Sequence, residues 1–363
     1  MMNHSLSCNG EYKQHTLVPF MDRFDYDDAA LACDKVVKEV EKRGLKPDDI
    51  QEGLILGSGL GGFVDERLDH EKRVAIPFWE ILGQLGIDPG SDSVKGHSKE
   101  LVIAPLKGDT AEHPVLIMAQ SGREHLYQGI HPKRATFWLR VMQLLGVKVL
   151  GGSTATGVVT PETIRVPQIV LIHSDNDDIG DNPLIGHHEI DGNGEDLWGP
   201  RFPHLNEEYP EDTRGVVKDV AKKEGIRLAE GLYIRTPTAP CYERPEDVYR
   251  MRTLARDIWR EGGMQRVDNR FHGAPTAVVG MSTTYEAIVA QHATQSEKHP
   301  AFRDGRFFLA AATDYAGALD TQNFVTPPTH AEVEMRAGML QENFAKLVRG
   351  TLLQLREQRK KHP

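Results

Sequence analysis

Short apolar runs alternate with longer stretches of helical periodicity along most of this chain, and this alternation constrains the fold more than any other feature. Continuous apolar runs of this length are typical of strands that are buried on both faces of a sheet. The runs cover residues 54–56, 101–104, 115–119, 147–150, 168–173, 232–234, 277–279 and 307–312.

Helical periodicity fills the segments between these runs. Pro132 and Pro245 suit first-turn positions, and the Thr-x-x-Glu sequences at 283–286 and 329–332 have the spacing of capping boxes. Because strands and helices are interleaved, we expect an α/β fold with a mostly parallel or mixed sheet covered by helices. The predicted helices cover residues 27–43, 132–145, 211–225, 245–263, 283–296 and 329–358.

No Pro/Gly-rich linker divides the pattern, so we expect one domain over residues 26–363, preceded by a loose lead-in at residues 1–25. A chain of 363 residues with 39% hydrophobic and 26% charged residues is neither collagen-like, nor a disulfide scaffold, nor disordered. The net charge of −10 argues against a nucleic-acid partner, but it allows a local cationic pocket.

The expected location is the cytoplasm. Cys8, Cys33 and Cys241 form no CxxC pair, which favours a reducing compartment. Residues 1–14 are polar and lack the apolar segment of a secretory signal. No run of 18 apolar residues occurs, so we expect no membrane partner.

Residues 174–213 form a long segment that is rich in Asp, Gly, Asn and Pro and has little periodicity. A loop of this length inside a compact domain is usually functional or disordered. Its apolar residues favour an ordered loop that packs on something; they include Leu184, Ile185, Trp198 and Phe202.

The segment 57–62, GSGLGG, follows a predicted strand and contains GxGxxG. A dinucleotide site would also need an acidic residue about 20 positions later at the end of the next strand, whereas Glu80 has no strand context. The amides and the Ser58 hydroxyl favour a turn that binds one phosphate group, and a strand-exit turn without a ligand is the alternative.

Two segments imitate metal sites. The calcium-loop pattern that starts at Asp175 fails, because Ile179 and Gly186 occupy ligand positions. His187, His188 and Glu189 lack HExxH spacing. We therefore expect no metal.

Arg123, His125 and Tyr127 follow the run 115–119 and point to one side if the chain stays extended. A guanidinium, an imidazole and a phenol at a strand end suit an oxyanion such as phosphate. Other strand ends lead to Ser58, to the segment 153–157 and to the segment 281–283. Hydroxyls, glycines and helix starts at strand ends form an anion-binding crevice in α/β sheets.

From about residue 26 to residue 355, the chain resembles the trimeric purine nucleoside phosphorylases, which include the methylthioadenosine phosphorylases. The resemblance rests on the ordered motifs GSGLGG, GH (with His97), GREHLYQG, LGVKVLGGSTATG, NPLIG, RFP, CYE, GMSTTYEAIVA and HAEV. It implies an α/β/α sandwich with a mixed, twisted central sheet, a homotrimer with sites near subunit interfaces, and a role in purine salvage. It also implies a pentosyltransferase that phosphorolyses purine (deoxy)ribonucleosides to free base and (deoxy)ribose 1-phosphate. Inorganic phosphate is then a co-substrate, and no cofactor is expected.

The resemblance also assigns roles to residues. It implies that phosphate is held by Ser58, His97, Arg123, His125, Ser282 and the backbone N–H of Ala155. The ribose would contact Tyr127, Tyr242, Met281, His330 and Trp198, the last reaching into a neighbouring subunit's site. The base would contact Glu243, Thr313 and Asp314. The groups expected to take part in catalysis are His125, Glu243, Asp314 and His330.

Several positions depart from the family pattern and leave the substrate open. Asp314 stands where 6-oxopurine enzymes carry Asn, and an ionised carboxylate can only accept a hydrogen bond, which favours a 6-amino group. Thr154 resembles the methylthioadenosine branch, but Ala316 lacks that branch's second Asp, and His330 suits a hydroxylated 5′ position. We expect a purine nucleoside phosphorylase that accepts 6-aminopurines. A methylthioadenosine phosphorylase and a catalytically inactive nucleoside-binding homologue are the alternatives.

Overall fold

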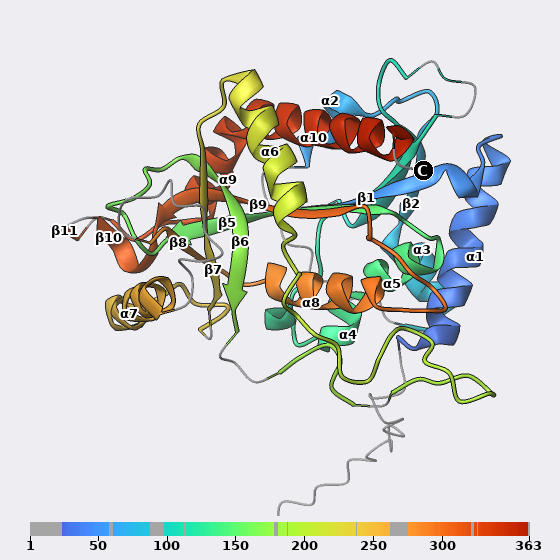
Figure 1. Cartoon of the computed structure of the whole chain (residues 1–363), viewed down its shortest axis with the longest axis horizontal. Coiled ribbons are helices and arrows are strands. Elements are labelled where there is room, and N and C mark those ends of the chain that lie inside the picture. Colours follow the sequence, from blue (N-terminus) through green and yellow to red (C-terminus); the bar gives the residue numbers. More distant parts are fainter. Residues whose placement is uncertain are drawn as a thin grey trace, which may run out of the picture.

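The computed structural model describes residues 24–57, 61–87, 98–109, 111, 114–177, 181–186, 188–236, 238–261, 275–320, 323–324 and 326–361. In these residues a nine-stranded mixed sheet lies between helices, as the sequence predicts (Figure 1). The strand order is β2-β3-β4-β1-β5-β8-β7-β6-β9, and an additional pairing of β9 with β5 closes the last five strands into a ring. The strands are β1 (Ile50–Leu56), β2 (Val74–Pro77), β3 (Glu100–Pro105), β4 (Leu116–Ser121), β5 (Val149–Val158), β6 (Gln168–Asn176), β7 (Leu228–Arg235), β8 (Ala277–Gly280) and β9 (Gly305–Tyr315), with a small hairpin of β10 (Leu319–Asp320) and β11 (Asn323–Phe324).

Helices cover both faces of this sheet (Figure 1). One apolar core lies under α1, α3, α5 and α8, and a second lies under α2, α6 and α10. Residues of β9 alternate between the two, because Phe308 and Ala310 enter the first core whereas Phe307 and Leu309 enter the second. The helices are α1 (Tyr26–Lys42), α2 (Gly62–Arg67), α3 (Phe78–Gln84), α4 (Pro132–Ala135), α5 (Phe137–Leu144), α6 (Glu211–Glu224), α7 (Pro245–Glu261), α8 (Thr283–Thr294), α9 (His330–Met339) and α10 (Gln341–Lys361), with 3₁₀ turns η2 (Pro47–Asp49), η3 (Leu126–Gln128) and η5 (Ala316–Ala318).

The predicted elements agree with this fold in most places. Each predicted run lies on or overlaps a strand, but β2, α2 and α3 were not predicted, and the helix predicted over 329–358 divides into α9 and α10. The capping box at 329–332 is confirmed. The one at 283–286 is wrong, because the residue before α8 is Ser282 and no side-chain hydrogen bond caps the helix.

The packed fold already includes residues 24 and 25. The Phe24 ring meets the Phe137 ring edge-on at 5.2 Å, and the Asp25 side chain accepts a hydrogen bond from the Asp28 N–H at the start of α1. The rest of the predicted lead-in, residues 1–23, lies outside the described residues. In the described part of the chain, no helix is long and apolar enough to cross a membrane.

Candidate active site

A cavity of about 390 Å³ opens where several strands of the sheet end. β4 leads into Arg123, β8 leads into Ser282, and the second half of β5 runs beside the end of β9. The cavity is lined by most of the residues predicted from the sequence: Arg123, His125, Tyr127, Ala155, Tyr242, Glu243, Met281, Ser282, Thr313, Asp314 and His330. Ser58 and His97 lie outside the described residues, so their predicted contacts with phosphate stay predictions.

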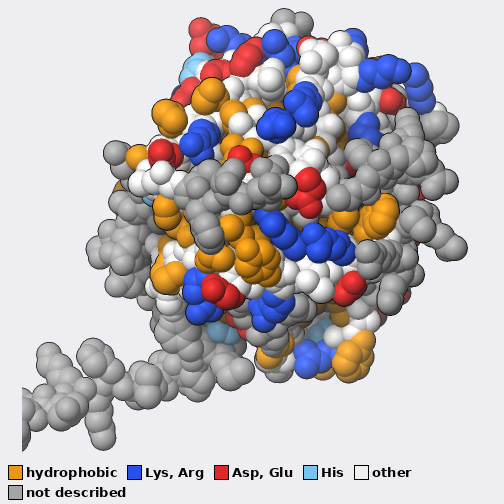
Figure 2. All heavy atoms as spheres, turned by 90° about the vertical axis from the view of Figure 1, so that its left-hand side faces the viewer, with side chains coloured by type: hydrophobic (Ala, Val, Ile, Leu, Met, Phe, Trp, Pro, Cys, Tyr) orange, Lys and Arg blue, Asp and Glu red, His pale blue; other side chains and the backbone are white. Residues whose placement is uncertain are grey.

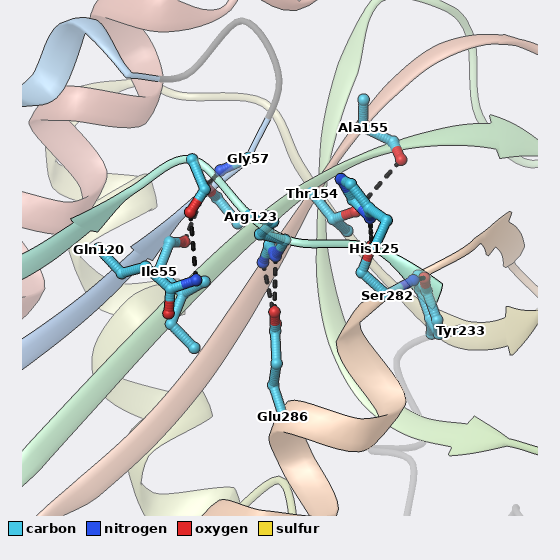
Figure 3. Close-up of polar contacts among 12 residues, drawn as sticks. Ile55, Gly57, Gln120, Arg123, His125, Thr154, Ala155, Tyr233, Ser282 and Glu286 are labelled. Carbon is cyan, nitrogen blue, oxygen red and sulfur yellow. Dashed lines mark hydrogen bonds and ion pairs between the residues drawn. The ribbon is translucent and has the colours of Figure 1, made fainter. Parts of the chain in front are cut away.

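One end of the cavity gathers hydrogen-bonding groups from three elements (Figure 3). The His125 Nδ1 lies 3.1 Å from the Ser282 hydroxyl, and Arg123 is 2% exposed beside them. The backbone passes close to this guanidinium at Gly57, where a Cβ atom would come within 2.5 Å of Arg123 Nη1 and 2.7 Å of the Ser153 carbonyl. Only glycine fits there without displacing the arginine.

The chain after β4 is not extended as predicted. Residues 126–128 form the η3 turn, which ends at Gly129 in the left-handed region (φ +76°). This turn stacks the His125 and Tyr127 rings at 4.7 Å, so both still reach the cavity. The predicted convergence of these side chains is confirmed, although its backbone geometry differs.

The β5 strand is longer than the run from which it was predicted. Its polar segment 153–156 lies inside the strand, where the Ser153 hydroxyl accepts from the Gly57 N–H at 3.0 Å and donates to the Ile55 carbonyl at 3.2 Å. These two bonds hold the end of β1 against β5. Thr154 and Ala155 therefore line the cavity from a rigid strand.

Two buried carboxylates lie at the other end of the cavity. Glu243 is 9% exposed and Asp314 is 6% exposed. Burial raises the pKa of the Asp314 carboxyl to about 6, against an opposing hydrogen bond from the Thr313 hydroxyl at 2.8 Å. Burial also raises the pKa of Glu243. A Cβ atom at Gly157 would lie 3.3 Å from an oxygen of Asp314, so this glycine leaves room for the carboxylate.

Tyr242 lies at the rim of the cavity and is 41% exposed. It precedes α7, whose end of the molecule faces the viewer in Figure 2, where hydrophobic side chains gather between Lys and Arg side chains. A half-exposed aromatic ring at a cavity mouth can stack on a flat ligand such as a purine.

The first turn of α9 closes another side of the cavity. His330 begins this helix, and Val333 follows on the same face and is buried. His330 was predicted from its motif, whereas Val333 was not predicted. The spacing of three residues inside a predicted helix was the signal that could have identified it.

Trp198 does not line this chain's own cavity, and its predicted contact with a neighbouring subunit's sugar stays a prediction. Its side chain is enclosed by its own chain: the indole N–H donates to Glu189 at 2.9 Å, and the Arg140 guanidinium lies 4.9 Å from the ring centre. Trp198 is 6% exposed and presents little surface to another chain. These contacts do confirm that this part of the 174–213 segment packs in an ordered way.

The comparisons with known proteins agree on one family. Residues 92–352 match the model of the phosphorylase superfamily. Purine nucleoside phosphorylase 1 of Bacillus subtilis (strain 168) is 32% identical over 308 residues, which is 85% of this chain and 93% of that protein. Purine nucleoside phosphorylase 1 of Geobacillus stearothermophilus is 35% identical over 247 residues, 68% of this chain and 75% of that one. The crystal structure of Schistosoma mansoni purine nucleoside phosphorylase with adenosine has the same fold, with a TM-score of 0.66 and 22% identity, and it covers 91% of this chain and 97% of that chain.

Proposed function

Because this chain belongs to the purine nucleoside phosphorylases of the phosphorylase superfamily, we propose that it cleaves the N-glycosidic bond of purine nucleosides with inorganic phosphate. The products are the free purine and ribose 1-phosphate or its 2-deoxy form, so the enzyme is a pentosyltransferase. One observation carries this proposal: a single cavity joins a hydrogen-bond-donor end, built by Arg123, His125 and Ser282, to a carboxylate end built by Glu243 and Asp314.

The hydrogen-bond-donor end would hold phosphate below the anomeric carbon of the sugar. The bond from C1′ to the purine nitrogen lengthens, and the sugar gains oxocarbenium character that the phosphate anion stabilises electrostatically. A phosphate oxygen then bonds to C1′ while the purine leaves with the electron pair of the broken bond. Fixed positions for both reactants supply much of the rate acceleration, and we propose that no metal or organic cofactor takes part.

The carboxylate end would receive the purine. Glu243 would accept hydrogen bonds from the edge of the base, and Asp314 would face its six-position with Thr313 beside it. Asp314 can accept from a 6-amino group when it is ionised and can donate to a 6-oxo group when it is protonated. With a pKa of about 6, both forms are accessible, which supports activity on 6-aminopurine nucleosides beside 6-oxopurine nucleosides.

The sugar would lie between these ends, against Tyr127 and Met281 and under the Tyr242 ring. At its 5′ position, the His330 imidazole suits a hydroxyl group. Val333, however, offers an apolar surface on the same helix face, and this contact favours a 5′-methylthio group. Methylthioadenosine phosphorolysis is therefore the second candidate function.

A substrate panel tests these assignments. Adenosine, inosine, guanosine and methylthioadenosine are each incubated with and without phosphate, and free base and sugar phosphate are quantified by chromatography. We expect base release only with phosphate, with adenosine among the substrates. Nucleoside binding without base release would indicate the inactive homologue instead.

We also propose that the enzyme is a homotrimer in the cytoplasm. Large apolar side chains protrude from the segment 183–205, among them Phe202, which is 89% exposed. Such residues are typical of a surface that a second subunit covers. Cys33 and Cys241 are free thiols, which suits a reducing compartment. Light scattering coupled to size-exclusion chromatography should give three chain masses, and F202S should shift the enzyme toward monomer.

A further inference from the structure

The guanidinium of Arg123 is held by Glu286, a carboxylate that was predicted to cap a helix. Nε donates to Glu286 Oε1 at 2.6 Å, and Nη2 donates to Oε2 at 2.9 Å (Figure 3). Both side chains are buried, at 3% and 6% exposure. Two parallel charge-assisted hydrogen bonds fix the plane of the guanidinium as well as its position.

Glu286 lies in the first turn of α8, four residues after Ser282. Its spacing from Thr283 predicted a capping box, but the carboxylate points to Arg123 instead (Figure 3). The Ser282 N–H in turn donates to the Tyr233 hydroxyl at 3.1 Å, which anchors the start of the helix. One anchored helix end therefore places the Ser282 hydroxyl and orients the Arg123 guanidinium together.

The pair selects which edge of the guanidinium is used for a ligand. An arginine has five N–H groups, and Glu286 takes the two along its Nε–Nη2 edge. The Nη1–Nη2 edge is then the one turned away from Glu286, with Nη1 close to the Gly57 backbone. That edge is the planar fork that matches two oxygens of a phosphate group.

We propose that Glu286 is a positioning residue for phosphate: it orients Arg123 so that this fork faces the anion. The inference rests on the proposed function, because it takes phosphate as the ligand of Arg123. Charge alone argues the other way, since a carboxylate beside an anion site repels the anion. The two effects therefore predict opposite changes in the KM for phosphate when the carboxylate is neutralised. Loss of positioning raises this KM, whereas loss of the repelling charge lowers it.

The test is E286Q in the full chain. The glutamine amide turns an NH₂ group toward one guanidinium N–H and so breaks the parallel pair. We expect the KM for phosphate at saturating nucleoside to rise about tenfold or more, because breaking a buried charge pair is costly. The KM for nucleoside at saturating phosphate should change by less than about threefold. E286D keeps the charge and should lie between wild type and E286Q.

A matched control separates positioning from general stability. Glu230 forms a similarly buried ion pair with Arg214 and does not line the cavity. E230Q and E286Q should both lower Tm, but E230Q should leave the KM for phosphate unchanged. An unchanged or lower KM for phosphate in E286Q, or an equal rise in E230Q, would overturn the proposal.

Calorimetric titration of phosphate into each protein without nucleoside measures the same effect without turnover. A wild-type protein that binds phosphate but releases no purine contradicts the proposed function alone, and weaker phosphate binding by E286Q still supports the role of Glu286. A wild-type protein that turns over normally while E286Q binds phosphate equally well contradicts the positioning role alone. A wild-type protein that neither binds phosphate nor releases purine contradicts both.

Discussion

Asp314 is the side chain whose chemistry bears most directly on the choice of base. In D314N an amide replaces a carboxyl of the same shape, and its NH₂ can donate to a 6-oxo group at every pH. We predict that the ratio of kcat/KM for inosine to that for adenosine rises about tenfold or more, since an unmatched buried polar group is strongly rejected. Steady-state kinetics with both nucleosides measure it.

The matched control for this change is D320N. Asp320 is a half-exposed residue of β10 that does not line the cavity. It should leave the ratio unchanged. If D314N also leaves the ratio where it is, Asp314 does not contact the six-position.

The protonation of Asp314 gives a second prediction, on pH. Its pKa of about 6 means that the carboxyl is mostly protonated below pH 6 and mostly ionised above it. The protonated form donates to a 6-oxo group, whereas the ionised form accepts from a 6-amino group. The inosine-to-adenosine ratio of kcat/KM should therefore fall between pH 5 and pH 7.

This ratio removes pH effects that both substrates share, such as titration of phosphate. D314N should give a flat ratio over the same range, because its amide does not titrate. A wild-type ratio that does not change with pH would show that Asp314 keeps one protonation state with substrate bound.

Several of the predicted residues that line the cavity follow a strand or begin a helix in a recognisable motif. Arg123 and Ser282 are examples. The contacts that the sequence did not predict depend on distant partners. Glu286 pairs with a residue 163 positions away, and Trp198 is enclosed by Arg140 and Glu189. Local spacing indicates which contacts a side chain can make with its neighbours in sequence. It does not indicate the distant residue that the side chain contacts in the fold.

The same distinction holds among the elements. Continuous apolar runs predicted the central strands, because strands that are buried on both faces of a sheet have this pattern. β2 is a four-residue edge strand that alternates buried and exposed residues, so it resembles a loop in sequence. β5 extends beyond its apolar run because hydroxyls such as Ser153 satisfy their hydrogen bonds inside the sheet.

The two predicted capping boxes allow a direct test of how side-chain caps stabilise these helices. In α9 the Thr329 hydroxyl accepts from the Glu332 N–H at 3.3 Å, and the Glu332 carboxylate accepts from the Thr329 N–H at 3.0 Å. T329A should cost about 1 kcal/mol. Since α9 also carries His330, the KM for nucleoside should rise, which kinetics and thermal unfolding would measure together.

T283A is the comparison for α8. This hydroxyl caps nothing and has no hydrogen-bond partner within the described residues, so its loss should lower Tm less than the loss of Thr329. Equal losses of Tm in both variants would mean that the observed bonds at Thr329 do not stabilise α9.

One ion cluster joins the first strand along the chain, β1, to the last helix, α10. Glu52 of β1 is fully buried, and its two oxygens accept from Arg356 Nε and Nη2 of α10, both at 2.7 Å. Arg359 Nη2 donates to the same carboxylate at 3.1 Å. These contacts span 304 residues of sequence and hold α10 over its apolar core.

E52Q would leave the two guanidinium groups around a neutral amide. Breaking a buried ion pair costs about 3–5 kcal/mol, so we predict that Tm falls by about 5 °C or more. The exposed pair of Glu357 and Lys360 on the same helix provides the control, because E357Q should cost less than about 1 kcal/mol. Glu52 does not line the cavity, so folded E52Q should keep the wild-type KM for phosphate and for nucleoside. If E52Q unfolds at the wild-type Tm, the apolar contacts of α10 hold the helix without this cluster. If its KM is altered, a change in the position of α10 affects the active site.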